Sequence, residues 1–197
     1  MVSFPMIPSL TQKQLSKQSV RMQTSFFSTA SDFVKSYQLD GTGEGNQVNV
    51  VCNTGHTLCT DIPKTMGGRD SGPQPVETLL AAWMGCTQAT ATFVGRQMTE
   101  RVPIQNIEFV NIEAFRDERG ALQLPIEETP AIPSRLQRIT GTIRVHTRTK
   151  EDLSSEQMEL LKEQTEIRCP VANMIISSGC SIDVQWVNAS SKLSRSK

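Results

Sequence analysis

The sequence lacks the features that mark membrane proteins, nucleic-acid binders and metalloproteins. No apolar run reaches the length of about 20 residues that a membrane-spanning helix needs. Acidic and basic side chains are equal in number, 20 of each, which leaves no basic excess for binding nucleic acid. Only two histidines are present, and the five cysteines show no CxxC spacing. We therefore expect no membrane segment, no nucleic-acid partner, and no bound metal or cofactor.

Several catalytic signatures are absent as well. The chain contains no Gly-rich phosphate loop, no GxSxG nucleophile motif and no internal repeat. Its 197 residues, of which 37% are hydrophobic, suffice for one full core. Five cysteines in a chain of this size are not the dense disulfide framework of a small secreted protein, so we expect free or redox-active thiols in a reducing compartment. The chemistry of this chain is expected at those thiols.

Acidic residues are missing from positions 1–31, which instead hold three basic side chains and seven serines. This bias is typical of an organellar transit peptide. Pro5 and Pro8 interrupt any early helix, and a disordered extension explains the composition equally well. The localisation is therefore expected to be cytoplasmic, with a mitochondrial destination as the alternative. We expect one domain at residues 32–188 and a polar tail at residues 189–197.

The most apolar stretch, residues 75–98, predicts a long central helix. Pro75 suits the first helical position, and Glu77 lies in the first turn, where a carboxylate favours the positive end of the helix dipole. Cys86 lies near the middle of this helix among Ala, Gly and Thr residues, so we expect it deep in the core or at a subunit interface. A loop rich in Gly and Pro, with Arg69 at its centre, precedes the helix.

Strand patterns precede this loop. Alternating side chains predict strands at residues 33–39 and 48–52, joined by the turn GTGEGN, and a third short strand that contains Cys59. Cys52 and Cys59 would then lie close across a hairpin. A disulfide between them is conceivable there, but we expect both side chains to pack within the strands.

The second half of the chain alternates between strand and helix patterns. Strands are predicted at residues 105–115, 122–126, 139–145 and 182–186, a turn at 117–120, and helices that begin after Ser154 and at Pro170. This order predicts an α+β fold with antiparallel strands in hairpins and helices on one side of them. Cys169 follows Arg168 and precedes Pro170, so we expect it to cap the second helix as a stabilised thiolate. His146 is expected to be a solvated surface residue and Cys180 a structural thiol.

Two of these stretches together resemble the OsmC/Ohr family, the osmotically inducible and organic hydroperoxide resistance proteins. They are PVETLLAAWMGCTQA, residues 75–89, and CPVANMI, residues 169–175. The order of predicted elements is similar to that of the family from about residue 34 to residue 187. The resemblance implies an OsmC-like α+β fold that closes only as an intertwined homodimer, with the long helices at its centre and two sites at the interface.

The resemblance also implies a thiol-dependent peroxidase that acts on organic hydroperoxides in oxidative stress defence. Cys86 would attack the O–O bond as the peroxidatic thiolate and become a sulfenic acid, which Cys169 would resolve as a disulfide. An external dithiol reductant of the lipoyl type would then reduce this disulfide. The alternative is a non-catalytic OsmC-like protein that binds a small apolar or thiol ligand and keeps the cysteines as packing residues.

Members of the Ohr branch place an Arg from an early strand turn and a Glu from the long helix beside the reactive thiol. The early turn GTGEGN has no Arg, so Arg69 is the nearby candidate to stabilise the thiolate, with a solvated loop cation as the alternative. Glu77 matches the Glu of the family as the candidate to orient the site, with capping of its own helix as the alternative. Its distance of nine residues from Cys86 points the two side chains to opposite faces of one helix. The chain therefore resembles a general OsmC-like member more than a true Ohr.

Overall fold

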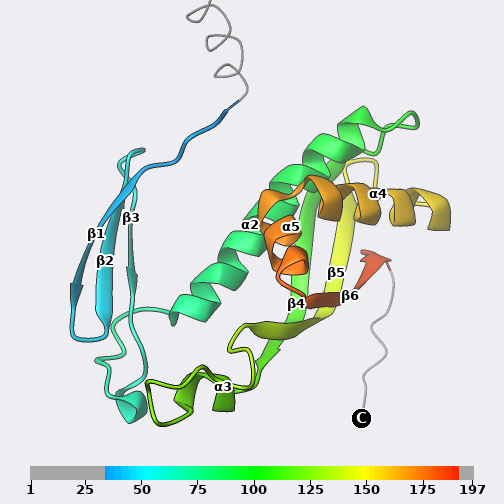
Figure 1. The fold of residues 1–197 in the computed structure, drawn as a ribbon. Helices are drawn as coiled ribbons and strands as arrows, with labels where there is room; N and C mark the ends of the chain where they lie inside the picture. Colours follow the sequence, from blue (N-terminus) through cyan, green and yellow to red (C-terminus); the bar gives the residue numbers. More distant parts are fainter. Residues whose placement is uncertain (1–33, 191–197) are drawn as a thin grey trace, which may run out of the picture. The chain divides into compact units, whose positions relative to one another are not determined.

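The computed structural model describes residues 34–190, which belong to two compact units divided between Cys59 and Thr60 (Figure 1). The predicted N-terminal extension lies outside the described residues, as does nearly all of the predicted polar tail. No helix within residues 34–190 is long and apolar enough to cross a membrane.

The first unit is a three-stranded sheet with the strand order β1-β2-β3. Its strands are β1 (Leu39–Glu44), β2 (Gln47–Cys52) and β3 (Thr57–Thr60). β1 and β2 are antiparallel, and a two-residue turn joins them with Gly45 at a φ of +62°, as such turns require. The strand predicted at residues 33–39 is wrong, since residues 34–38 form no strand and pairing begins at Leu39. The pairing continues through the glycines because a β-ladder needs only backbone groups.

The two cysteines of this sheet, Cys52 and Cys59, form no disulfide and are half-buried. The side-chain amide of Gln47 donates a hydrogen bond to Cys59 Sγ at 3.3 Å, whereas Cys52 lies at the other end of β2. Both cysteines are therefore strand residues, and the conceivable disulfide between them is not formed.

The second unit combines a three-stranded sheet, in the order β4-β5-β6, with helices of different lengths. Its elements are η1 (Lys64–Met66), α2 (Pro75–Gln97), β4 (Ile104–Arg116), α3 (Arg119–Leu122), β5 (Leu136–Thr147), α4 (Ser155–Arg168), α5 (Pro170–Ser177) and β6 (Ser181–Asn188). The α+β class and the long helix are confirmed. β4 and β5 are antiparallel as predicted, whereas β6 pairs parallel with β5 after the crossover through α4 and α5.

The connection between β4 and β5 differs from the prediction. The sequence predicts a return strand at residues 122–126, but α3 and an irregular loop occupy this position. Gly120 fits tightly under the Ile132 carbonyl, where a Cβ atom would approach the oxygen to 2.2 Å, so the loop folds back over α3. Three prolines between residues 125 and 133 lack the N–H donors that a sheet strand needs.

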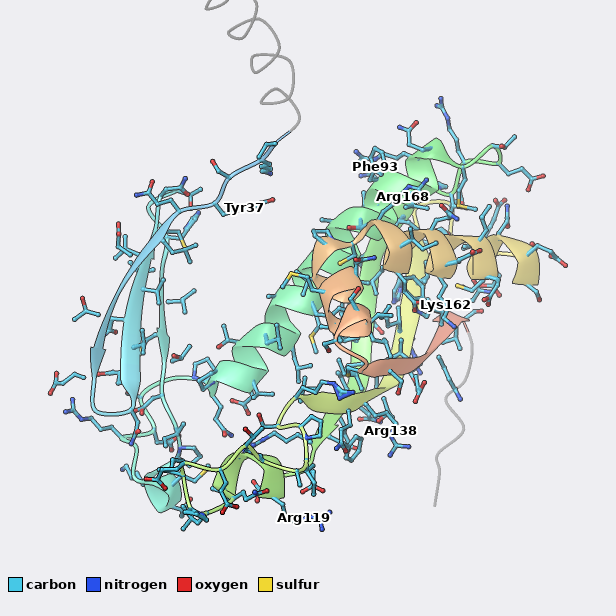
Figure 2. All side chains as sticks on the ribbon, in the orientation of Figure 1. Tyr37, Phe93, Arg119, Arg138, Lys162 and Arg168 are labelled. Carbon is cyan, nitrogen blue, oxygen red and sulfur yellow. The ribbon has the colours of Figure 1, made fainter. Side chains whose placement is uncertain are left out.

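The core of the second unit lies between α2, the sheet, α4 and α5. Its most deeply buried side chains come from all of these elements: Trp83, Ala91, Ile139, Ile143, Leu161 and Ala172. α2 buries a single stripe at helical spacing, formed by Trp83, Thr87, Ala91, Val94 and Gly95. Another side of α2 exposes Leu79. Phe93 is exposed as well and is labelled in Figure 2. The second unit therefore leaves part of this apolar helix uncovered.

Candidate active site

The two candidate thiols meet where α5 packs against α2. Cys86 lies in the middle of α2, and Cys169 is the N-cap residue of α5. Pro170 at the first helical position starts α5 directly after Cys169, as the sequence pattern predicts. Cys86 packs against the core cluster that contains Cys169, close enough to influence the pKa of Cys169, although 83 residues separate the two in the sequence, and both thiols are free. The fold thus brings together the two cysteines on which the sequence analysis centres.

Cys169 is fully buried, with 0% of the residue exposed. Its Sγ accepts a hydrogen bond from the Ala172 backbone N–H at 3.3 Å. Burial raises the pKa of Cys169 and the contact with Cys86 raises it further, while the N–H groups of Ala172 and Val171 lower it in part. The prediction of a stabilised, accessible Cys169 thiolate is therefore wrong, because loss of hydration outweighs the effect of the helix N-terminus.

The cation that was expected beside Cys169 points elsewhere. The Arg168 guanidinium donates a hydrogen bond to the side-chain oxygen of Gln164, one turn earlier on α4. This contact directs the positive charge along α4. With its sulfur buried and its pKa raised, Cys169 remains a protonated thiol at neutral pH.

Cys86 lies at the border between two faces of α2. It is half-buried and packs against the core cluster that contains Cys169. At about 100° of rotation per residue, Cys86 is about 60° from Trp83 in the buried stripe and about 20° from the exposed Phe93. One side of Cys86 therefore meets the core, and the other side borders the exposed apolar face of the helix.

Gln88 anchors this part of α2 to the sheet. Its side-chain Oε1 accepts a hydrogen bond from the Ile107 backbone N–H of β4 at 2.7 Å. Its Nε2 donates to the Thr92 hydroxyl at 3.0 Å, which holds the amide in this orientation. The link fixes the rotation of α2 two residues after Cys86. Sequence analysis missed this residue because a single Gln in a helix carries no recognisable pattern.

Glu77 caps its own helix. Its carboxylate accepts a hydrogen bond from the Gln74 backbone N–H at 2.8 Å, in a capping box at the start of α2. Glu77 and Cys86 lie half a helical rotation apart, so they do not meet within one chain. An orienting role for Glu77 stays a prediction.

Arg69 lies in a loop whose shape depends on Asp61. The Asp61 carboxylate is fully buried and accepts hydrogen bonds from the N–H groups of Ile62, Arg69 and Ser71 and from the Ser71 hydroxyl, at 2.8 to 3.1 Å. Burial alone would raise the pKa of Asp61, but these four hydrogen bonds lower it to about 2. Asp61 is a second residue that sequence analysis missed. The role of Arg69 beside a thiolate stays a prediction.

The low pKa of Asp61 predicts a defined pH dependence of stability. The folded protein holds the carboxylate ionised to about pH 2, whereas its ordinary pKa is 3.8, so the stabilisation is complete above pH 4 and is lost as the pH falls through this window. Asp61→Asn should remove this stabilisation and flatten the dependence between pH 4 and pH 2. Urea unfolding at several pH values measures it. Asp70→Asn, an exposed change in the same loop, is the control, and equal slopes for wild type and Asp61→Asn would contradict the assignment.

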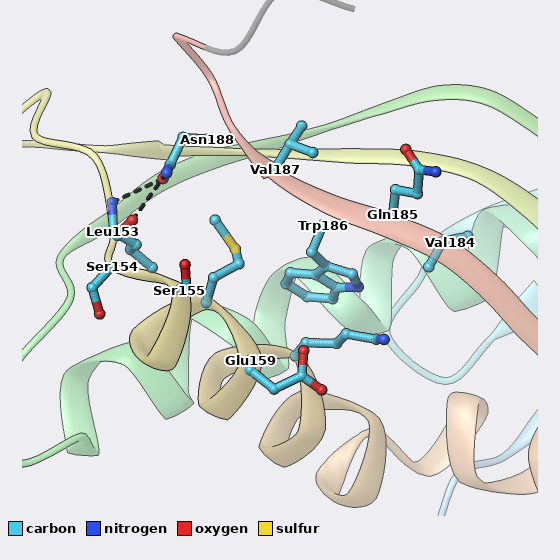
Figure 3. A pocket seen from close by; sticks show the side chains of 11 residues that line it. Leu153, Ser154, Ser155, Glu159, Val184, Gln185, Trp186, Val187 and Asn188 are labelled. Atoms are coloured by element: carbon cyan, nitrogen blue, oxygen red, sulfur yellow. Dashed lines mark hydrogen bonds between the residues drawn. The ribbon is translucent and has the colours of Figure 1, made fainter.

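The cavity between α4 and β6, of about 580 Å³, does not contain either thiol (Figure 3). It is lined by Met158, Glu159 and Lys162 of α4 and by Val184 to Asn188 of β6. Across residues 34–190, no group of three or more His, Cys, Asp or Glu side chains is arranged to hold a metal ion. The paired thiols therefore offer the clearest chemistry in the second unit.

Comparison with known proteins identifies the family of this chain. A family model for OsmC-like protein matches residues 68–185, which is more than half of the chain. A comparison with curated protein sequences gives no match.

Solved structures with the same fold include an OsmC-like protein from Mycoplasma pneumoniae, 18% identical, with a TM-score of 0.58 over 78% of this chain and 97% of that one. An OsmC-like protein of unknown function from Vibrio cholerae is 9% identical, with a TM-score of 0.60 over 78% and 100% of the two chains. An organic hydroperoxide resistance protein from Legionella pneumophila is 15% identical, with a TM-score of 0.51 over 79% and 97%. These likenesses show the shared fold. With the family match, they establish that the chain belongs to the OsmC-like protein family.

Proposed function

We propose that this protein is a thiol-dependent peroxidase that reduces organic hydroperoxides in the defence against oxidative stress. The observation that carries the proposal is the contact between the Cys86 and Cys169 thiols, one partly accessible and one buried. A peroxidatic thiol needs access for its substrate, and a resolving thiol needs proximity. One of the structural relatives, from Legionella pneumophila, is described as an organic hydroperoxide resistance protein, which supports the choice of substrate class.

The reaction proceeds in two steps at sulfur. The Cys86 thiolate attacks the terminal oxygen of the hydroperoxide, so that an S–O bond forms, the O–O bond breaks, and the alkoxide leaves and is protonated to the alcohol. The Cys169 sulfur then attacks the sulfenic sulfur of Cys86, forming the S–S bond and releasing the oxygen as water. An external dithiol reduces the disulfide by exchange and restores both thiols.

The test of this function is consumption of an organic hydroperoxide in the presence of a dithiol. Wild-type protein at micromolar concentration should remove tert-butyl hydroperoxide catalytically when dihydrolipoamide is present in excess. Protein whose thiols have been alkylated by iodoacetamide should not accelerate the background reaction of the dithiol. Equal rates with active and alkylated protein would support the alternative function, a binding protein for a small apolar or thiol ligand.

Replacing the resolving thiol should stop the cycle after its first step. In Cys169→Ser, hydroperoxide should convert Cys86 to a sulfenic acid, because a serine hydroxyl cannot form a disulfide. Dimedone should then add to Cys86 in this variant and much less in the wild type, as mass spectrometry of the peptide would show. Excess hydroperoxide should over-oxidise Cys86 in the variant. Equal dimedone labelling in both proteins would contradict the role of Cys169.

The active form is proposed to be a homodimer, because α2 leaves one face uncovered. This face carries exposed residues at helical spacing: Ala82, Gly85, Ala89 and Phe93. A Cβ atom added at Gly85 would meet nothing within 4 Å, so the chain itself does not require glycine there. Small side chains allow two helices to approach closely. Since Cys86 borders this face, a second copy packed on it would complete each site at the interface.

A further inference from the structure

Gln88 is held in one orientation by hydrogen bonds on both sides of its amide group. Its side-chain Oε1 accepts from the Ile107 backbone N–H of β4 at 2.7 Å, and its Nε2 donates to the Thr92 hydroxyl at 3.0 Å. The Thr92 hydroxyl in turn donates to the Gln88 backbone carbonyl at 2.8 Å. A backbone N–H can only donate, so the amide oxygen faces Ile107 and the amide nitrogen faces Thr92. The side chain therefore joins α2 to β4 in a defined geometry.

The group that Gln88 binds on β4 is rigid. Ile107 is paired with Val145 in the ladder between β4 and β5, and its side chain is buried in the core. Its N–H therefore cannot follow a movement of α2 as a flexible side chain could. A shift of α2 by more than about 0.5 Å would stretch this hydrogen bond past the normal range of about 2.7 to 3.2 Å. The bond thus resists rotation and sliding of α2.

Cys86 and Gln88 lie at the two borders of the buried stripe of α2. Thr87 belongs to the middle of that stripe, so its two neighbours in the sequence lie about 100° to either side of it. Both are half-buried. At one border Gln88 binds β4, and at the other Cys86 packs against the core cluster that contains Cys169. A rotation of α2 about its axis would therefore displace both side chains together.

We propose that Gln88 is a positioning residue: its hydrogen bond to Ile107 fixes the rotation of α2 and thereby holds the Cys86 sulfur within reach of Cys169. The Cα atoms of a helix lie about 2.3 Å from its axis and a side-chain sulfur lies farther out, so a rotation of about 15° moves the sulfur by about 1 Å. A disulfide requires its Cβ atoms about 3.5 to 4.5 Å apart, which leaves little room for such a shift. The proposal rests on the proposed function, since it concerns the step that forms the disulfide.

In that step the Cys169 sulfur attacks the sulfenic sulfur of Cys86. The S–S bond forms as the S–O bond breaks, and the departing hydroxide takes the thiol proton of Cys169 and becomes water. Misplacement of Cys86 would slow this step, whereas hydroperoxide from solvent would still oxidise the half-buried Cys86. The sulfenic acid would then persist until a second hydroperoxide converts it to a sulfinic acid.

The experiment measures how oxidised Cys86 divides between disulfide and sulfinic acid. Gln88→Leu in the full-length protein keeps an uncharged side chain of similar size and high helix propensity but has no acceptor. After treatment with a small excess of tert-butyl hydroperoxide, the ratio of sulfinic acid to disulfide at Cys86 should rise at least about tenfold over the wild type. Mass spectrometry of the peptide of residues 70–96, which contains no other cysteine, gives both products. The rate at which the Cys86 thiol disappears should stay close to that of the wild type.

Controls separate this effect from a loss of folding. Gln97→Leu makes the same change at an exposed position near the end of α2 and should leave the ratio unchanged. Circular dichroism before oxidation reports whether Gln88→Leu is folded. If it is not, Gln88→Asn takes its place, because a side chain shorter by one carbon cannot reach Ile107 unless α2 moves.

Equal ratios in wild type and in a folded Gln88 variant would overturn the proposal. Failure of the proposed function would look different, because hydroperoxide would then not oxidise Cys86 even in the wild type. Diamide, an oxidant that joins two thiols without a sulfenic acid, tests the positioning in that case. The disulfide between Cys86 and Cys169 should form more slowly with diamide in Gln88→Leu than in the wild type. Equal diamide rates, or no such disulfide in the wild type, would also overturn the proposal.

Discussion

Cys86→Ser should lower the rate of organic hydroperoxide consumption by at least about a thousandfold, a typical effect of removing a nucleophile. The serine hydroxyl is not ionised at neutral pH and cannot form the sulfenic acid that starts the cycle. The buried Cys169 thiol cannot replace it, because it remains protonated and has no exposed surface. The measurement is the disappearance of tert-butyl hydroperoxide with dihydrolipoamide in excess, corrected for the reaction of the dithiol alone.

Cys180→Ser is the matched control for this loss. Cys180 is also a buried free cysteine, and its thiol donates to the Ser181 carbonyl at 3.5 Å. This variant should retain hydroperoxide consumption close to that of the wild type. Equal rates for Cys86→Ser and wild type would reject the enzymatic function, whereas equal losses in both serine variants would indicate a general effect on folding.

Gly85→Leu should convert a homodimer to a monomer while leaving the fold of the chain intact. Within the chain, position 85 has open space around it, so a side chain there meets no described atom within 4 Å of its Cβ. Glycine in the middle of a helix costs about 1 kcal/mol relative to alanine, so the substitution should favour α2 itself. A second α2 packed against this face would instead meet four added carbon atoms at its point of closest approach. Sedimentation velocity at micromolar concentration and circular dichroism measure the two effects.

Two further variants test whether the effect is local. Glu163→Leu adds the same side chain at an exposed position of α4 and should leave the oligomeric state unchanged. Gly95→Ala belongs to the buried stripe of α2, where the added Cβ would lie 2.4 Å from the Val102 carbonyl oxygen, so it should destabilise the fold itself. A stable monomer of the wild-type protein would contradict the homodimer and remove the interface from the proposed site.

Features that depend on local sequence could be predicted well. The sequence places α2 at residues 75–98, and the helix covers Pro75–Gln97. The Ser154 capping box and the cap at Cys169 are both present, because each depends on side chains within three or four residues of the helix start. The alternation of apolar and polar side chains along β5 and β6 could also be read from the sequence, since one face of each strand packs in the core.

Features that depend on distant contacts could not be predicted. The apolar alternation at residues 122–126 is typical of a strand, but within residues 34–190 this segment pairs with no strand of either sheet. Burial decides the state of Cys169, and the sequence showed only its N-cap position and the adjacent Arg168. Asp61 and Gln88 hold their own segments in place through hydrogen bonds to backbone groups 8 to 19 positions away, and no spacing pattern in the sequence predicts such contacts.

The most direct test of the central claim, that Cys86 and Cys169 react as one redox pair, is mass spectrometry after one equivalent of hydroperoxide. The reduced protein is treated, its remaining thiols are blocked, and tryptic peptides are analysed without reduction. We predict a disulfide between the peptides of residues 70–96 and 169–192, with fragmentation placing the link at Cys169 because Cys180 lies in the same peptide. Cys180→Ala should give the same linked pair. Oxidation confined to Cys180 or to the first-unit cysteines, with Cys86 still reduced, would contradict the account.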